Sequence, residues 1–176
     1  MDRPVSTAWA KPLRLSEVRG PLEIDLAPEA AERASIAKTL GIVSLPELSA
    51  RLRVRPWLDG VEITGRFEAV VEQASAVSLE EFQHPLCGEI EIRAVPAGSP
   101  NAGESVAGEV DLDPEAPDPP DILDSDAIDL ASYVVEHLAL EIDPFARKPG
   151  EAFEFEPPPE PDSPFAVLKK LKSDQR

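Results

Sequence analysis

The chain has a single cysteine, Cys87, few aromatic residues and no long apolar run. One cysteine excludes an internal disulfide and a zinc site built from several thiolates, and a reducing cytoplasm is the expected compartment. No stretch of about 18 apolar residues occurs, so we expect no membrane span and no membrane partner. The N-terminus lacks a basic patch followed by an apolar segment, so no signal peptide is predicted. With only 5% aromatic residues, the core has to be built from Leu, Val, Ile and Ala.

Positive charge is missing from a long part of the chain. No Lys or Arg lies between Arg93 and Arg147, and residues 76–146 contain 17 acidic residues against the single Arg93. This middle segment therefore carries nearly all of the net charge of −17. Such a segment repels phosphate, because nucleic-acid affinity comes mainly from Lys and Arg that displace counterions. A basic protein is the expected partner, and plain solvation of an acidic chain is the alternative.

The patterns of common catalytic and metal sites are also incomplete. His84 and Cys87 are three residues apart, but no third group is placed to orient the histidine for nucleophilic catalysis. A calcium loop starting at Asp111 would need glycine at its sixth position and glutamate at its twelfth, where the chain has Ala116 and Ile122. We therefore predict a non-enzymatic protein without a metal site or a cofactor.

Regular elements are predicted in the first half of the chain. Alternating apolar residues predict a strand over residues 22–26. A helix is expected from Pro28, which suits a first-turn position, to Leu40, and Gly41 supplies a stop signal. Ser44 and Glu47 form a capping-box pattern, which predicts a short helical turn there.

The clearest local pattern is a hairpin. Asp59 and Gly60 stand between two alternating stretches, a sequence typical of a tight turn between antiparallel strands. The incoming strand includes Leu52, and the outgoing strand is expected to continue to about Ala74. A further strand is predicted over residues 83–95, from the same alternation.

The second half of the chain is more irregular. Residues 96–121 are rich in Pro, Gly and acidic residues, and we expect a long surface loop that is partly disordered. An amphipathic helix is predicted to begin at Asp124. Residues 157–163 form a proline-rich linker, and residues 164–176 a short basic helical tail. The order of elements predicts one α+β domain over residues 1–156, with an antiparallel sheet and packed helices.

Two sets of charged residues are the candidate binding sites. The acidic set would attract a basic protein, and it consists of Asp118, Asp121, Asp124, Asp126 and Asp129. The alternative is direct RNA binding by arginines that share one strand face together with tail lysines, and this set consists of Arg51, Arg53, Arg55, Lys169, Lys170 and Lys172. Alternating arginines are also typical of a solvated strand face, and the acidic set is also consistent with a generic protein-binding module.

Four stretches carry a resemblance to a known family, and together they span most of the chain. They are residues 21–33, 70–82, 121–130 and 163–171, and the acidic stretch that leads into a helix at 121–130 is the most specific. On these stretches the chain resembles the YceD family, the large-ribosomal-RNA-subunit accumulation proteins, in its alphaproteobacterial form. The resemblance implies a bacterial, cytoplasmic, non-enzymatic factor that supports accumulation or maturation of large-subunit (23S) ribosomal RNA. The acidic segment adds the expectation that it binds a basic ribosomal or ribosome-assembly protein.

The chain departs from that family at its cysteines. Many relatives carry cysteine pairs, suggestive of metal, near the turn that contains Ser75 and again after the acidic helix. Here Ser75 stands where a cysteine is common, and residues 145–150 contain none. Cys87 lies outside the pattern. A metal site built from cysteines is therefore not expected in this chain.

Overall fold

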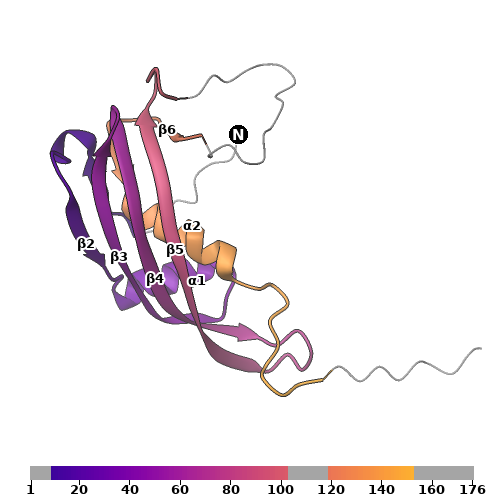
Figure 1. The fold of residues 1–176 in the computed structure, drawn as a ribbon. Helices are drawn as coiled ribbons and strands as arrows, with labels where there is room; N and C mark the ends of the chain where they lie inside the picture. The colour runs from indigo at the N-terminus through magenta and orange to yellow at the C-terminus, as the bar shows by residue number, and fades with distance from the viewer. Residues whose placement is uncertain (1–8, 103–118, 153–176) are drawn as a thin grey trace, which may run out of the picture.

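The structure is a computed structural model that describes residues 9–102 and 119–152. Figure 1 shows a tall, curved sheet with α1 (Ala30–Leu40) and α2 (Leu130–Glu141) behind it. The sheet order is β2-β3-β4-β5-β6, and β1 pairs separately with β7. The strands are β1 (Pro12–Arg14), β2 (Leu22–Leu26), β3 (Ser44–Trp57), β4 (Gly60–Ala74), β5 (Glu81–Pro96), β6 (Asp121–Leu123) and β7 (Ala127–Asp129). The helices are a 3-10 turn (Leu15–Glu17), α1 (Ala30–Leu40) and α2 (Leu130–Glu141).

The expected α+β class is confirmed, but the sheet is mixed rather than wholly antiparallel. Strands β2 to β5 pair antiparallel, whereas β6 runs parallel to the end of β5. Most of the loop predicted over residues 96–121 lies outside the described residues, as do the linker at 157–163 and the tail at 164–176. Neither α-helix of the described part has the long apolar sequence that crossing a bilayer requires.

The predicted hairpin is confirmed as the pair β3–β4. Trp57 and Gly60 are partners next to the turn, and Leu58 rather than a glycine takes a positive φ of 50° within it. Gly60 is needed for a different reason. A Cβ at this position would lie 2.0 Å from the carbonyl oxygen of Ala94 on β5, so only glycine lets the two strands approach.

The helical turn predicted at Ser44 and Glu47 is wrong, because both residues belong to β3. They are three residues apart on β3, but their partners on β4 are two apart, so β3 contains one extra residue, a bulge. The bulge brings both Leu45 and Leu48 to the core side, where both are buried. Apolar residues three apart are typical of a helix, and here the bulge produces the same spacing in a strand.

The two helices pack on the inner face of the sheet. The predicted strand at 22–26 is confirmed. The predicted helix is confirmed as α1, which begins at Ala30 rather than at Pro28 because Glu29 is its N-cap, and Gly41 ends it with a φ of 70°. Helix α2 begins at Leu130 and not at Asp124, because residues 127–129 pair with β1 before the helix starts. The buried stripe of α2 covers β5 and consists of Leu130, Ala131, Val134, Val135 and Leu138.

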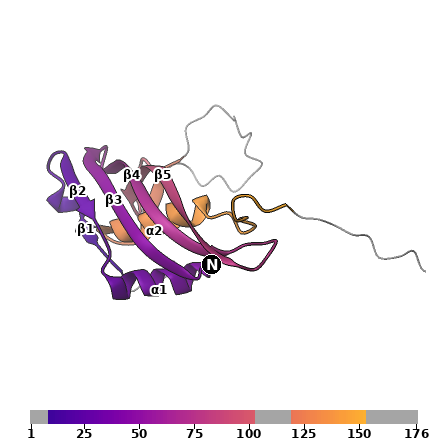
Figure 2. The same ribbon diagram turned by 90° about the horizontal axis from the view of Figure 1, so that it is seen from below.

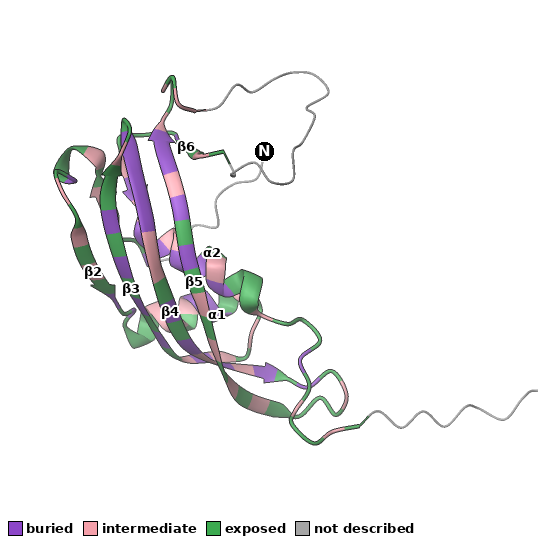
Figure 3. Ribbon diagram, viewed as in Figure 1, coloured by how far each residue is buried: buried purple, intermediate pink, exposed green. Residues whose placement is uncertain are grey.

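The core lies between the sheet and the helices, and one face of the sheet has no cover among the described residues. Figure 2 shows both helices on the same side of the curved sheet, and Figure 3 shows buried and exposed residues alternating along β3. As predicted, the buried residues are mostly Leu, Val, Ile and Ala, and Phe67 and Trp9 are the aromatic exceptions. The opposite face, called the outer face below, presents charged side chains.

Candidate functional site

The three arginines of the RNA-binding alternative lie together on the outer face of β3. The prediction that they share a strand face is confirmed, since all three are exposed and alternate with buried residues. Each one, however, contacts a carboxylate on a neighbouring strand. The pairs are Arg51–Asp25 at 3.0 Å, Arg53–Glu23 at 3.1 Å and Arg55–Glu62. These arginines are therefore charge-compensated within the sheet.

Glu62, Arg55 and Arg93 form a network of side chains with Glu62 at its centre. The Glu62 side chain is 3% exposed, and it accepts hydrogen bonds from Arg55 and, at 3.1 Å, from Arg93. Burial raises the pKa of the Glu62 carboxyl, but the two arginines outweigh burial and hold that pKa below its ordinary value. Arg93 also lies over the ring of Trp57, 5.5 Å from the centroid. The network joins β3, β4 and β5 through cross-strand pairs.

The acidic candidate residues divide into structural and free groups. Asp129 caps α2, because its carboxylate accepts the N–H of Ala131 at 3.1 Å and that of Lys11 at 2.7 Å. Asp121 accepts the hydroxyl of Tyr133 at 3.0 Å. The side chains of Asp124 and Asp126 are exposed in the bend between β6 and β7, and no described residue contacts either as a hydrogen-bond or ion-pair partner.

The remaining candidates cannot be placed. Asp118 and the tail residues Lys169, Lys170 and Lys172 lie outside the described residues. The structure therefore brings together Asp121, Asp124, Asp126 and Asp129 at one end of the sheet. It places the arginines on the outer face, across β3.

Beside these aspartates lies an open groove of about 610 Å³. Its walls come from β5, from the segment that enters β6, and from α2, and its lining is Glu91, Ile92, Arg93, Pro119, Asp121, Tyr133, Glu136, His137 and Leu140. Three carboxylates line it against one arginine, and that arginine already contacts Glu62 at 3.1 Å and Glu91 at 3.7 Å. The groove is therefore negatively charged, and its apolar lining residues are Ile92, Pro119 and Leu140.

Two groove side chains are fixed by hydrogen bonds. His137 Nδ1 lies 2.9 Å from the carbonyl oxygen of Tyr133, one helical turn earlier. Burial, followed by the charge of Asp121, raises the pKa of the Tyr133 phenol. The hydroxyl therefore stays protonated and donates to Asp121, which fixes β6 against α2.

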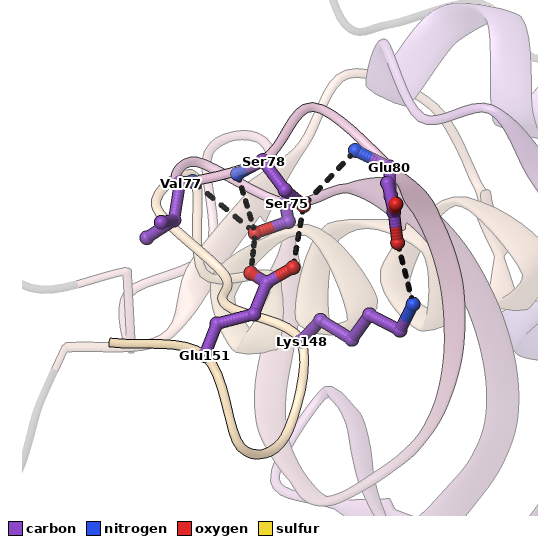
Figure 4. A network of polar contacts seen from close by, with 6 residues as sticks. All are labelled: Ser75, Val77, Ser78, Glu80, Lys148 and Glu151. Carbon is purple, nitrogen blue, oxygen red and sulfur yellow. Dashed lines mark hydrogen bonds and ion pairs between the residues drawn. The ribbon is translucent and has the colours of Figure 1, made fainter. Parts of the chain in front are cut away.

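A second polar cluster joins the β4–β5 turn to the segment after α2. Ser75 is fully buried, and Figure 4 shows its hydroxyl and that of Ser78 both donating to the carboxylate of Glu151. These two hydrogen bonds lower the pKa of Glu151. Lys148 Nζ contacts the Glu80 carboxylate at 2.6 Å. We call this cluster the serine clip, and it closes the lower end of the fold.

The serine clip joins the turn that contains Ser75 to the segment after α2, which includes residues 145–150. Here the segments are held by two serines and one carboxylate, and by a backbone bond of 2.9 Å from Ala76 to Ala146. Within residues 9–102 and 119–152, no three side chains of His, Cys, Asp or Glu gather closely enough to hold a metal ion.

His84 and Cys87 do not form a nucleophile–base pair. Residues three apart on a strand point to opposite faces, and Cys87 is exposed on the outer face whereas His84 is half-buried. His84 Nε2 lies 2.8 Å from the side-chain oxygen of Gln73, and its ring stacks on Phe82.

The groove, with Tyr133, Glu136 and His137 in its lining, was not predicted from the sequence. The groove forms because β6 pairs only with the end of β5 and α2 crosses beneath, which are contacts between distant parts of the chain. The amphipathic pattern of α2 and the strand over residues 83–95 were both visible in the sequence, but their packing against each other was not. Comparison of the chain with models of protein families, with characterised proteins and with solved structures finds no match.

Proposed function

We propose that this chain is a non-enzymatic ribosome-biogenesis factor of the bacterial cytoplasm. It supports the accumulation or maturation of large-subunit (23S) ribosomal RNA by binding a basic ribosomal or ribosome-assembly protein. The observation that carries the proposal is the contrast between the two charged surfaces. The three candidate arginines of β3 are paired with carboxylates, whereas Asp124 and Asp126 have no cationic partner among the described residues.

The acidic end attracts a basic protein through its uncompensated charge. Residues 119–143 contain seven acidic residues and no Lys or Arg. The groove adds Glu91 to this set, and its one arginine is already engaged. Uncompensated charge of one sign speeds encounter with a partner of the opposite sign and repels RNA phosphates. This balance favours a protein partner over direct contact with RNA.

The family resemblance supports the ribosomal part of the proposal. Its most specific stretch, residues 121–130, forms β6, the acidic bend and the start of α2 in this structure. The residues that carry the resemblance and the residues that carry the free negative charge are thus the same segment. A binding role for this segment accounts for both.

The test in cells is the abundance of ribosomal RNA after deletion of the gene. We expect a selective fall in mature large-subunit RNA relative to small-subunit RNA, together with large-subunit precursors. A plasmid copy of the gene should restore the ratio. An unchanged ratio and a normal subunit profile in the deletion strain would contradict the proposal.

The test of the binding mode uses the purified chain with isolated large-subunit ribosomal proteins. Binding should weaken steeply as salt rises, because the attraction between exposed charges is screened. Direct RNA binding is the rival and makes a different prediction. If the chain binds 23S transcript and reversal of Arg51, Arg53 and Arg55 to Glu abolishes that binding, the RNA-binding alternative replaces the protein-partner mechanism.

A further inference from the structure

One backbone edge of the sheet is open along most of β5. On one side, residues 81–94 of β5 pair with β4 in a continuous register. On the other side, only Ala94, Val95 and Pro96 have partners, which are the three residues of β6. No described residue pairs with residues 81–93 on that side. The backbone groups that point there are available to another strand.

Alternation along the strand identifies those backbone groups. Ala97, directly after β5, donates its N–H to the carbonyl oxygen of Leu123 at 3.0 Å, so residue 97 faces the β6 side. N–H directions alternate along a strand, and the β4–β5 register has no bulge. Cys87, Glu89 and Glu91 therefore direct their N–H and C=O groups to the open edge.

Pro85 agrees with this assignment and marks the lower limit of the edge. It has the same parity as Cys87, and its missing N–H costs no hydrogen bond to β4. Above the open stretch, β6 occupies the edge. The available length is thus bounded by a proline at one end and by a paired strand at the other.

The side chains beside this edge are acidic on the outer face. Glu89 and Glu91 are both exposed there. Glu91 lies 3.7 Å from Arg93, whereas no described residue contacts the Glu89 carboxylate as a hydrogen-bond or ion-pair partner. On the inner side the edge borders the groove, where Glu136 and Leu140 of α2 stand opposite Ile92. A strand added here would have carboxylates on both sides and an apolar contact below.

The other sheet edge, β2, lacks these properties. It is only five residues long, and its outward carboxylates Glu23 and Asp25 are already paired with Arg53 and Arg51. Its charge is thus compensated, and an incoming basic strand would gain little there. The two edges of the same sheet thus differ in length and in the carboxylate of Glu89, which no described residue contacts and which has no counterpart on β2.

We infer that the β5 edge binds an extended basic segment of the partner protein as an added strand. The segment forms backbone hydrogen bonds with Cys87, Glu89 and Glu91, and places Lys or Arg next to the two glutamates. Its alternate side chains enter the groove against Ile92 and Leu140. This inference rests on the proposed function for the class of partner, and it adds the conformation and the site of binding.

Other candidate occupants of the β5 edge come from this protein itself, and their charges distinguish them. Residues 103–118 carry six acidic residues and no Lys or Arg, so they are repelled from an acidic edge. A second copy of β5 would bring Glu89 and Glu91 against their own counterparts. The basic residues Lys169, Lys170 and Lys172 of the same chain are the competitor with the right charge, and the experiment below separates them from a partner.

The test is amide hydrogen exchange of the full chain, followed residue by residue by NMR. The probe is a short capped peptide of alternating lysine and valine, and the control peptide has glutamate in place of lysine. In the free chain, we expect fast exchange at Cys87, Glu89 and Glu91 and slow exchange at Gly88 and Ile90. The lysine peptide should slow the three fast amides by about tenfold or more, and the glutamate peptide should not.

A variant pair separates backbone pairing from charge. Glu89→Pro removes the outward N–H and the carboxylate, whereas Glu89→Gln removes only the charge. Because residue 89 directs its N–H away from β4, Glu89→Pro should fold, as Pro85 already shows for the same parity. We expect the proline variant to bind the lysine peptide at least about tenfold more weakly than the glutamine variant. Equal affinities of two folded variants would overturn strand addition.

The other outcomes of the peptide experiment overturn the inference that a partner strand binds at the β5 edge. If the peptide fails to bind, or binds without slowing exchange at the three amides, the inference is overturned. It is also overturned if the amides are already protected in the free chain and are released by reversing Lys169, Lys170 and Lys172 to Glu, because the tail is then the occupant. Protection that grows with protein concentration would instead assign the edge to a second copy.

The hydrogen-exchange experiment and the deletion experiment can fail separately, so the strand site and the proposed function are tested apart. Protection of the three amides in a chain whose deletion leaves ribosomal RNA unchanged would retain the strand site and remove the biogenesis role. A ribosomal RNA defect in the deletion strain, without protection of the edge, would retain the role and remove the strand site.

Discussion

Glu62 and Arg93 face each other across β4 and β5, joined by a hydrogen bond of 3.1 Å although Glu62 is almost completely buried. Arg55 reaches the same carboxylate from β3. Arg55 and Arg93 thus link β3, β4 and β5 through the single carboxylate of Glu62. This arrangement explains why an arginine-rich strand does not by itself make a nucleic-acid surface.

Replacing Glu62 should therefore destabilise the sheet. Glu62→Gln removes the charge that two arginines share, and we expect a loss of about 1–3 kcal/mol in the free energy of unfolding, measured in urea at neutral pH. Glu68→Gln, at an exposed position on the same strand, should change it by less than about 0.5 kcal/mol.

The pH dependence has a definite sign. The pKa of Glu62 is lowered by folding, so its stabilising contribution is present above the ordinary glutamate pKa of 4.5 and is lost as pH falls through the folded-state value. The difference in stability between the native chain and Glu62→Gln should thus shrink below that pH. A difference that grows in acid would show that the carboxylate is not stabilised by the arginines.

The acidic residues between β6 and α2 should separate into structural and binding groups. Asp129→Ala removes the cap of α2 and should lower the free energy of unfolding by about 1 kcal/mol. Asp124→Ala, five residues earlier and without a side-chain partner among the described residues, should leave stability within about 0.5 kcal/mol. Thermal or urea unfolding checks both, and equal losses would mean that the bend is also structural.

Gly88 should be intolerant of a side chain. A Cβ at Gly88 would lie 2.6 Å from the ring of Phe67 and 3.3 Å from Cγ of Glu141, so Gly88→Ala forces α2 away from β5. We expect a loss of about 1–3 kcal/mol in the free energy of unfolding. Gly20→Ala is the matched control, since nothing lies within 4 Å of that Cβ. A neutral Gly88→Ala would contradict the close packing of α2 on β5.

The serine clip should hold the segment after α2 against the β4–β5 turn. Ser75→Ala removes a buried hydroxyl that donates to Glu151 and accepts the N–H of Val77 at 3.1 Å. We expect faster amide exchange at Ala76, whose N–H bonds to Ala146, and a stability loss of about 1–2 kcal/mol. Ser78→Ala, at an exposed position, should have a smaller effect on both. Unchanged exchange at Ala76 would mean that the clip is not needed to dock the segment.

Local patterns were sufficient for the elements whose partners are close in sequence. The alternation on both sides of Asp59 and Gly60 specified the long hairpin, because the two strands pair with each other. Gly41 specified the end of α1 through its left-handed backbone conformation. In these cases the physical cause lies within a few residues of the sequence pattern.

Elements that depend on distant partners were predicted less well. Asp124, Asp126 and Asp129 are all good helix caps, and only the pairing of β7 with β1 selects Asp129. The bulge near Ser44 likewise depends on β4. The groove could not be predicted, because it depends on where β6 and α2 meet β5. The acidic charge of the site was evident from the sequence, but the open backbone edge beside it was not.

Complementation of a deletion strain asks whether the acidic end of the protein carries the proposed function. The sole copy of the gene would carry Asp121→Asn, Asp124→Asn and Asp126→Asn, which keep side-chain size and hydrogen-bond acceptors. The control, Glu47→Gln, Glu68→Gln and Glu81→Gln, removes the same charge from exposed positions elsewhere. We expect a lowered ratio of large-subunit to small-subunit RNA with the aspartate variant and a normal ratio with the control. A normal ratio with an aspartate variant that is present at normal levels would contradict this role of the acidic end.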